Sequence, residues 1–132
     1  MAETILRHIS EGRIEVASAG TDPKSDIHPM AREAVKRLLD VEMTGQWPKS
    51  LDHFVSRRFD YVITVCDSAA EMCPVFPGGT LQLHWSYPDP VVFAGTDEEK
   101  QRAFDQLAQR MMARMQAWLS VSALLERLKA ER

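Results

Sequence analysis

Apolar residues are distributed along this chain in two patterns, a spacing of three and four that is typical of amphipathic helices and short continuous runs that are typical of buried strands. Apolar positions three and four apart predict helices over Met1–Ser10, Pro29–Leu39, Leu51–Ser56 and Thr96 to about Ser120, followed by a last amphipathic segment through Lys129. A run of β-branched and aromatic residues predicts a strand at Tyr61–Val65, and short apolar stretches predict strands at Ile14–Ala19 and Leu81–Trp85. Because strands alternate with helical segments, the fold class is α/β, with three strands in a parallel sheet flanked by helices.

The long C-terminal helix has the clearest end signals. Thr96 and Glu99 have the capping-box spacing at its start, whereas Ser120 and Ser122 are expected to break it. Its core-facing positions are predicted to be Phe104, Leu107, Ala108, Met111, Met112, Met115, Trp118 and Leu119. The first helix, by contrast, starts at Met1 with no capping side chain ahead of it.

The central feature of the sequence is the apolar run Tyr61–Val65, which ends on Cys66. A run that is apolar at almost every position predicts a strand buried on both faces, as in a parallel sheet. Ligand and catalytic groups in such sheets lie at the carboxyl ends of strands, which is where Cys66 is placed. The only other cysteine, Cys73, follows seven positions later in the connecting segment.

Length and composition limit the classes of protein that fit. The 132 residues suit a single domain over positions 1–132, and a net charge of −3 gives no electrostatic footprint for nucleic acid. No apolar run approaches the roughly 20 residues that span a bilayer, and no signal peptide opens the sequence, so we expect a cytoplasmic location and no membrane partner. In that compartment cysteines are usually thiols rather than structural disulfides.

The residues themselves leave several interpretations open. Cys66 and Cys73 fit two buried packing thiols, a redox pair or, less well, a zinc site that includes His84. Asp89, between two prolines, fits either a turn residue or a general acid on a rigid loop. The four histidines, at positions 8, 28, 53 and 84, fit surface or packing positions better than metal ligands.

Five blocks of the chain, in order, resemble one family. They are ILRHISEGRIEVASAGTDP, HPMAREAVKRLLD, DYVITVCDSAAEMCPVFP, HWSYPDP and GTDEEKQRAF. Together they resemble the thioredoxin-coupled arsenate reductases of the low-molecular-weight protein tyrosine phosphatase superfamily. The most specific part is C-D-S-A-x-x-x-C-P upstream of W-S-Y-P-D-P, because ordinary phosphatases of the superfamily share the Asp-Pro but not this cysteine pair.

This resemblance implies a reaction and a role for three residues. In the family, the cysteine of a C-x5-R phosphate loop attacks arsenate, and the cysteine matching Cys66 then attacks the adduct and releases arsenite. The cysteine matching Cys73 takes over the disulfide, which thioredoxin reduces as an external reductant, with no bound cofactor and no metal. The aspartate matching Asp89 protonates the leaving oxygen. The implied partners are thioredoxin and arsenate or a phosphate-like oxyanion.

The chain departs from the family pattern in one respect, because it contains no C-x5-R. The first strand and the phosphate loop of the family are expected ahead of Met1, so the resemblance implies an N-terminally truncated domain. Burying five apolar residues of such a strand contributes roughly 7–15 kcal/mol, comparable to the stability of a whole domain, about 5–15 kcal/mol. We therefore expect one of three outcomes. The remaining strands close up the sheet, a segment of another chain takes the place of the missing strand, or a homodimer covers the exposed faces.

Three functions remain in competition at this level. The first is an arsenate reductase, inactive as written for want of the nucleophile. The second is a non-catalytic dithiol redox or binding protein that uses the same two cysteines. The third is a relative of the tyrosine phosphatases, which the cysteine pair disfavours.

Overall fold

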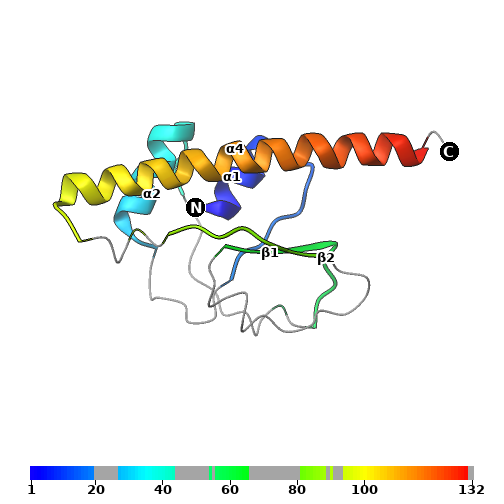
Figure 1. Cartoon of the computed structure of the whole chain (residues 1–132), viewed down its shortest axis with the longest axis horizontal. Coiled ribbons are helices and arrows are strands. Elements are labelled where there is room, and N and C mark those ends of the chain that lie inside the picture. Colours follow the sequence, from blue (N-terminus) through cyan, green and yellow to red (C-terminus); the bar gives the residue numbers. More distant parts are fainter. Residues whose placement is uncertain are drawn as a thin grey trace. The chain divides into compact units, whose positions relative to one another are not determined.

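The computed structural model describes residues 1–19, 27–43, 54, 56–65, 81–88, 90 and 94–130, except the side chains at positions 125 and 129. Within these ranges the elements are α1 (Ala2–Ile9), α2 (Pro29–Leu39), β1 (Tyr61–Thr64), β2 (Leu81–His84) and α4 (Asp97–Ala130) (Figure 1). The three helices belong to one compact unit and the two strands to a second unit. The α/β class and the parallel pairing are confirmed, and the prediction of one domain over 1–132 stays a prediction.

Helix α1 ends in two consecutive left-handed residues. Its start has no side-chain cap, as expected. At its end, the Glu11 N–H bonds to the His8 carbonyl at 3.2 Å and the Gly12 N–H to the Arg7 carbonyl at 3.3 Å, which is the Schellman pattern. Glu11, with φ 54°, takes the left-handed position that glycine usually occupies, and Gly12 follows at φ 74°. The chain therefore turns sharply after Ser10, at some steric cost in Glu11.

Helix α2 has the bounds predicted from the sequence and an unusual cap. The Nδ1 atom of His28 accepts a hydrogen bond from the Met30 N–H at 3.1 Å, while Pro29 occupies the first helical position. The same imidazole stacks on Phe104 of α4, with ring centroids 4.8 Å apart and an interplanar angle of 26°. His28 therefore caps α2 and also contacts α4.

Helix α4 begins as predicted but ends differently. The Thr96 hydroxyl accepts from the Glu99 N–H at 3.2 Å and donates to the Glu99 carboxylate at 3.1 Å, which confirms the side-chain cap. The predicted break at Ser120 and Ser122 is wrong, because α4 continues to Ala130. A serine inside a helix costs only about 0.5 kcal/mol relative to alanine, and the Ser120 hydroxyl donates to the Gln116 carbonyl at 3.0 Å. No glycine or proline lies within α4 to stop it.

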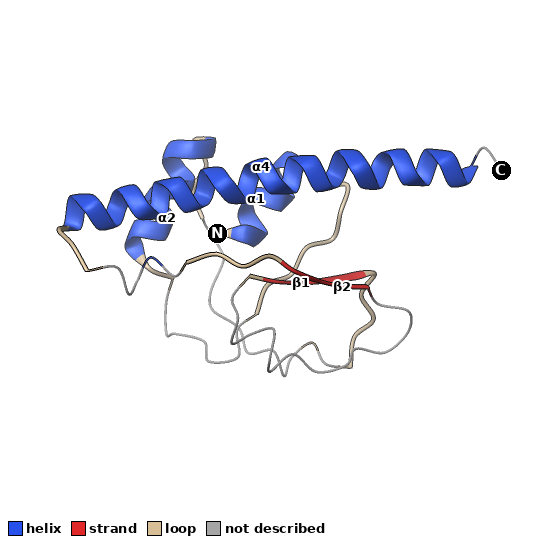
Figure 2. Cartoon of the chain, viewed as in Figure 1, coloured by secondary structure: helices blue, strands red, loops and turns tan. Residues whose placement is uncertain are grey.

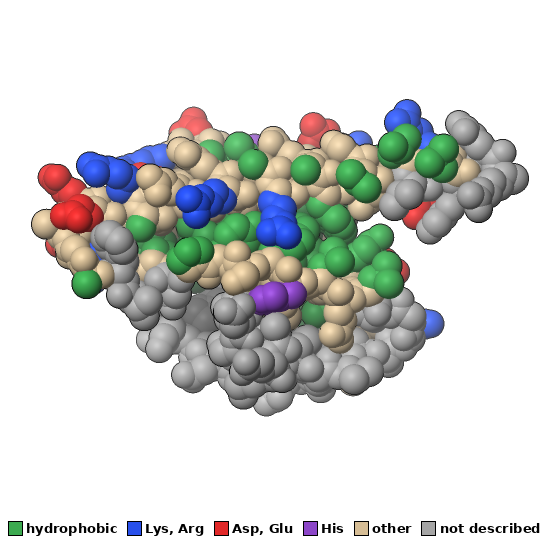
Figure 3. All heavy atoms as spheres, in the orientation of Figure 1, with side chains coloured by type: hydrophobic (Ala, Val, Ile, Leu, Met, Phe, Trp, Pro, Cys, Tyr) green, Lys and Arg blue, Asp and Glu red, His purple; other side chains and the backbone are tan. Residues whose placement is uncertain are grey.

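The core of the helical unit forms where α4 packs against α1 and α2. Its buried apolar side chains are Ile5, Leu6, Ala31, Ala34, Val35, Met43, Phe104, Ala108, Met111 and Met115. Half of the predicted α4 stripe therefore reaches the core, and the rest is only half-buried. Beyond Met115 the helix presents Val121, Leu124 and Leu128 at about half exposure, and hydrophobic side chains are visible on this part of α4 in Figure 3.

The two strands form a short parallel sheet, drawn in red in Figure 2. Tyr61 faces Leu81 and Thr64 faces His84 in the register. The prediction that the first of these strands is buried on both faces is wrong, because Tyr61 is 38% exposed and the other three residues of β1 are half-buried. A sheet of two four-residue strands is too small for other elements to bury both of its faces.

The third predicted strand, Ile14–Ala19, is also wrong, since these residues form no strand and Ile14 lies in a bend. A strand requires a neighbour that exchanges backbone hydrogen bonds with it. In this segment the Val16 carbonyl instead accepts from the Arg7 guanidinium at 2.8 Å. The described sheet therefore contains β1 and β2 rather than three strands.

Candidate functional site

The candidate site begins at the carboxyl ends of β1 and β2, where Thr64 and His84 lie opposite each other. The Thr64 hydroxyl lies 2.8 Å from Nδ1 of His84 and also contacts the Leu83 carbonyl at 3.4 Å. The hydroxyl can donate to the carbonyl while it accepts from an Nδ1–H, or donate to Nδ1 of the other tautomer. In both cases the side-chain pair fixes the imidazole at the end of the sheet.

The backbone continues the pairing for one residue beyond the strands. The Trp85 N–H donates to the Thr64 carbonyl at 2.8 Å, and the Trp85 side chain is only 6% exposed. The exit of β2 is therefore held by a backbone hydrogen bond and by burial of a large side chain. A rigid strand end of this kind is where parallel sheets place reactive groups.

The three residues singled out by the sequence, Cys66, Cys73 and Asp89, lie outside the described residues. What the structure describes is the strand ahead of each of two of them. Cys66 is the second residue after Thr64, and Asp89 the fifth after His84, so both follow strands whose carboxyl ends are paired. Thr64 was not predicted as a site residue from the sequence. The available signal was its position at the end of an apolar strand, two residues before a cysteine.

The segment after β2 carries one further polar group. Tyr87, two positions before Asp89, has a buried hydroxyl that makes no hydrogen bond within the described part of the chain. A buried hydroxyl left unpaired costs about 1–3 kcal/mol. The Tyr87 hydroxyl is therefore a hydrogen-bond donor two positions before Asp89, the predicted general acid, in the sequence.

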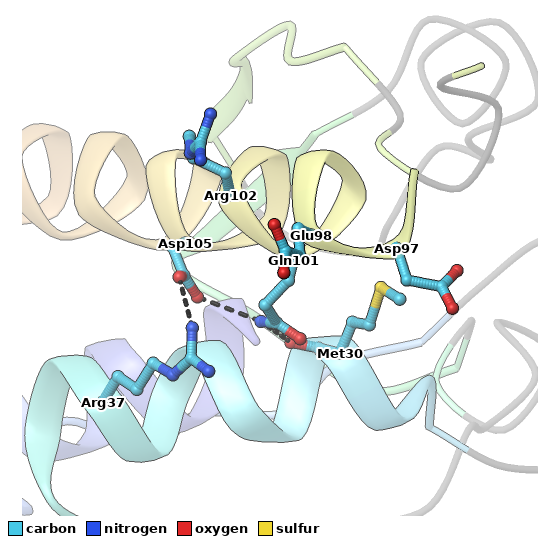
Figure 4. A pocket seen from close by; sticks show the side chains of 7 residues that line it. All are labelled: Met30, Arg37, Asp97, Glu98, Gln101, Arg102 and Asp105. Carbon is cyan, nitrogen blue, oxygen red and sulfur yellow. Dashed lines mark hydrogen bonds and ion pairs between the residues drawn. The ribbon is translucent and has the colours of Figure 1, made fainter. Parts of the chain in front are cut away.

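A concave region lies between α2 and the start of α4 and has a volume of about 460 Å³ (Figure 4). The Arg37 guanidinium bonds to Asp105 at 2.9 Å and to Glu33 at 3.2 Å, and these contacts, above all the hydrogen bond to Asp105, raise the Arg37 pKa. Gln101 donates to Asp105 and to the Met30 carbonyl, each at 3.0 Å. Figure 4 shows the side chains of Arg37, Gln101 and Asp105 turned toward one another.

The charges lining this hollow do not suit an oxyanion. Its lining includes two arginines, Arg37 and Arg102, and three carboxylates, those of Asp97, Glu98 and Asp105. The sum is negative, and Arg37 is already paired with carboxylates. We therefore interpret the hollow as the polar contact between α2 and α4 and not as the reactive site.

Within the described ranges, no group of three or more His, Cys, Asp or Glu side chains is arranged to hold a metal ion. No helix in those ranges combines the length and the apolar character needed to cross a bilayer. His28 acts as a helix cap and His84 pairs with Thr64, as expected for packing and surface histidines.

The comparisons with known proteins agree with this fold. The family model described as low molecular weight phosphotyrosine protein phosphatase matches residues 1–132. The chain belongs to this family.

Within the family, its relatives include arsenate reductases. It is 30% identical over 118 residues to an arsenate reductase of Oceanobacillus iheyensis, with 89% of this chain and 84% of the relative covered. It is 34% identical over 112 residues to arsenate reductase 2 of Staphylococcus saprophyticus, with 84% and 82% covered. The solved structure of a thioredoxin-dependent arsenate reductase of Corynebacterium glutamicum superimposes with a TM-score of 0.60 at 29% identity, covering 88% of this chain and 54% of that one.

Proposed function

We propose that this chain is arsenate reductase-like and carries the relay part of the thioredoxin-coupled reaction, with Cys66 and Cys73 as the relay cysteines, and that as written it is inactive because it lacks the attacking cysteine. The observation that carries the proposal is the parallel register, in which Thr64 faces His84 and both strands end at the same edge. The segments with Cys66 and Asp89 leave the sheet from this edge. The identity to arsenate reductases supports the choice of reaction.

The proposed relay has three exchanges. An attacking cysteine first forms a sulfur–arsenic bond, and arsenate loses an oxygen that Asp89 protonates. The Cys66 thiolate then attacks the sulfur of this adduct, so that arsenite leaves with the electron pair of the broken bond and a disulfide forms. The Cys73 thiolate finally attacks Cys66, which releases the first cysteine and leaves a Cys66–Cys73 disulfide.

The reductant proposed for that disulfide is thioredoxin. Its two thiols transfer two electrons through a mixed disulfide, which returns both cysteines of this chain to thiols. No bound cofactor is required, because the electrons arrive and leave through sulfur. The thioredoxin-dependent relative supports this partner, and such thiol chemistry suits a reducing cytoplasm.

The attacking cysteine and its arginine are the parts that the 132 residues do not supply, because neither Cys66 nor Cys73 is followed by arginine at the sixth position. We therefore expect this polypeptide to reduce no arsenate when it is mixed with thioredoxin, thioredoxin reductase and NADPH. The measurement is arsenate-dependent NADPH oxidation. A rate above the protein-free blank would refute this expectation, whereas activity of a version preceded by a strand and a C-x5-R loop would support the proposed reaction.

The relay itself can be tested without arsenate. We expect mild oxidation to produce an intramolecular Cys66–Cys73 disulfide, detected as a loss of 2 Da by intact-mass measurement after thiol blocking. Thioredoxin with its reductase and NADPH should reverse it. The variants Cys66→Ser and Cys73→Ser are matched controls, since each keeps one thiol and can form only intermolecular links. Free thiols or only intermolecular links in the parent chain would contradict the proposal.

A second function is favoured by one observation, the lack of C-x5-R within these residues. In that alternative the same two cysteines cycle as a dithiol with thioredoxin, and no oxyanion is reduced. The two functions predict different results for the version of the chain that carries the added C-x5-R loop. Arsenate turnover by that version supports the reductase, and thioredoxin-linked cycling without turnover supports the dithiol protein.

A further inference from the structure

The C-terminal part of α4 carries an exposed apolar stripe. Its members, Ala117, Val121, Leu124 and Leu128, follow one another at spacings of four, three and four, which places them on one face of the helix. All four are exposed, and the three larger residues are 56%, 48% and 48% exposed in that order. A single exposed apolar residue is ordinary, whereas a contiguous row is typical of a surface that binds another element.

The stripe is distinct from the face by which α4 enters the core. That face runs through Met111 and Met115, and the same spacing continues it to the half-buried Ser122. Val121 precedes Ser122 by one residue, so it lies about 100° around the helix from the core face. The 34 residues of α4 extend over about 51 Å, whereas the 11 residues of α2 extend over about 17 Å. The C-terminal part of α4 therefore continues past α2 and α1 (Figure 1).

From this arrangement we propose that the stripe is a dimer interface, against which α4 of a second copy of this chain packs antiparallel. With the twofold axis between Ser122 and Ala123, Val121 meets the second copy's Leu124. In the same register Ala117 meets the second copy's Leu128, and the symmetry repeats both contacts. The spacing of four and three is that of a coiled-coil seam, and the small Ala117 leaves room for the larger Leu128.

The charges beside the stripe favour the antiparallel orientation. Arg114 continues the stripe by one step and is exposed. In a parallel pair in register, the two Arg114 side chains lie at the same level and repel each other. In the antiparallel pair they are separated by about 25 Å along the axis. Arg127 then comes close to the second copy's Ser120, whose hydroxyl can accept from the guanidinium while it donates to the Gln116 carbonyl.

The size of the contact predicts a weak dimer. The overlap from Ala117 to Leu128 covers about 18 Å of helix. Stable dimers bury roughly 800 Å² on each partner, and three half-exposed side chains on each copy supply only a fraction of that area. The association is therefore reversible, with a dissociation constant on the order of 100 µM.

Sedimentation equilibrium of the 132-residue chain under reducing conditions, from about 5 µM to about 500 µM, tests the association. We expect the weight-average mass to rise from near 15.0 kDa toward twice that value. Leu124→Glu places a carboxylate at the centre of the contact and should weaken association about tenfold or more, and Val121→Glu is a second variant with the same expectation. Ala123→Glu is the matched control, because it adds the same charge on the opposite face of α4 and should associate like the parent. Circular dichroism establishes that each variant keeps its helices. Equal association of Leu124→Glu and Ala123→Glu would overturn the proposal.

The orientation is tested in a Cys66→Ser, Cys73→Ser background with one new cysteine in each chain. Mild oxidation of an equal mixture of Ala117→Cys and Leu128→Cys chains should give mainly mixed dimers, which intact mass distinguishes from the two symmetric ones. Leu128→Cys alone should link poorly, because its two copies lie about 16 Å apart along the axis. Preferred linkage of Leu128→Cys to itself would overturn the antiparallel arrangement. A parent chain that stays at 15.0 kDa throughout would overturn the dimer, and its co-sedimentation with phosphatidylcholine–phosphatidylserine vesicles would then assign the stripe to a membrane surface.

Discussion

The stacked pair of His28 and Phe104 offers a quantitative test of how α2 is attached to α4. Phe104 is 3% exposed, and its ring lies 4.8 Å from the imidazole, at 26° to it. Stacked aromatic pairs contribute about 0.5–1.5 kcal/mol beyond the area that they bury. The His28 side chain also caps α2, and loss of such a cap costs about 1 kcal/mol.

These two contributions can be separated with three variants. His28→Asn keeps a good capping side chain but loses the ring, so we expect a loss of about 0.5–1.5 kcal/mol. His28→Ala loses both and should cost about 1.5–2.5 kcal/mol. Phe104→Leu keeps an apolar side chain in the core, and the double variant with His28→Asn completes a thermodynamic cycle whose coupling energy should be about 0.5–1.5 kcal/mol.

The assay is urea unfolding followed by circular dichroism at a helical wavelength. With slopes of about 1–3 kcal/mol/M for a small protein, a change of 1 kcal/mol moves the midpoint by roughly 0.3–1 M, which is readily measured. Additive effects of His28→Asn and Phe104→Leu would refute the reasoning, because they would mean that the ring contact contributes nothing. A His28→Ala variant as stable as His28→Asn would likewise remove the role assigned to the cap.

Three further predictions concern helix ends and the interior of α4. Thr96→Ala should lower the free energy of unfolding by about 1 kcal/mol while Thr96→Ser leaves it nearly unchanged, because the hydroxyl accepts from the Glu99 N–H; equal urea midpoints for the two variants would contradict this. Glu11→Gly should raise stability by about 1 kcal/mol, since Glu11 has φ 54° and glycine adopts that conformation without steric cost; a lower melting temperature would argue against a left-handed Glu11. Ser120→Ala should raise stability by about 0.5 kcal/mol and leave helix content intact; a loss of far-ultraviolet ellipticity would mean that the helix does not continue past this residue.

Local signals predicted α1, α2 and the start of α4 well because their causes are local, whereas most of the predicted helix Leu51–Ser56 lies outside the described residues. Pro29 in the first turn and the apolar spacing that follows defined α2 to the residue, and Thr96 with Glu99 marked the start of α4. The end of α4 was missed because serine is a weak helix breaker, and one hydroxyl bond to Gln116 accommodates it. The cap of α2 was missed as well, because histidine is not among the usual capping residues and its acceptor role depends on ring orientation.

The strands were predicted less well because a strand depends on its neighbours. Tyr61–Thr64 and Leu81–His84 pair with each other, whereas Ile14–Ala19 has a similar pattern and forms no strand. Periodicity cannot distinguish these cases, since the difference lies in whether a partner offers its backbone groups. The candidate site residues Cys66, Cys73 and Asp89 came from motif and spacing alone, and they stay predictions.

The sequence by itself determined the α/β class, the positions of α1, α2 and the two paired strands, and the family, because helix periodicity, apolar runs and the cysteine motif are local features of the chain. Only the tertiary structure decided that Thr64 meets His84 and that His28 stacks on Phe104. These contacts join residues 20 and 76 positions apart, and they exist only when strand register and helix packing bring the two side chains together. Hydrogen bonds and ring contacts act over a few ångströms, so the chemistry of this site depends on that register.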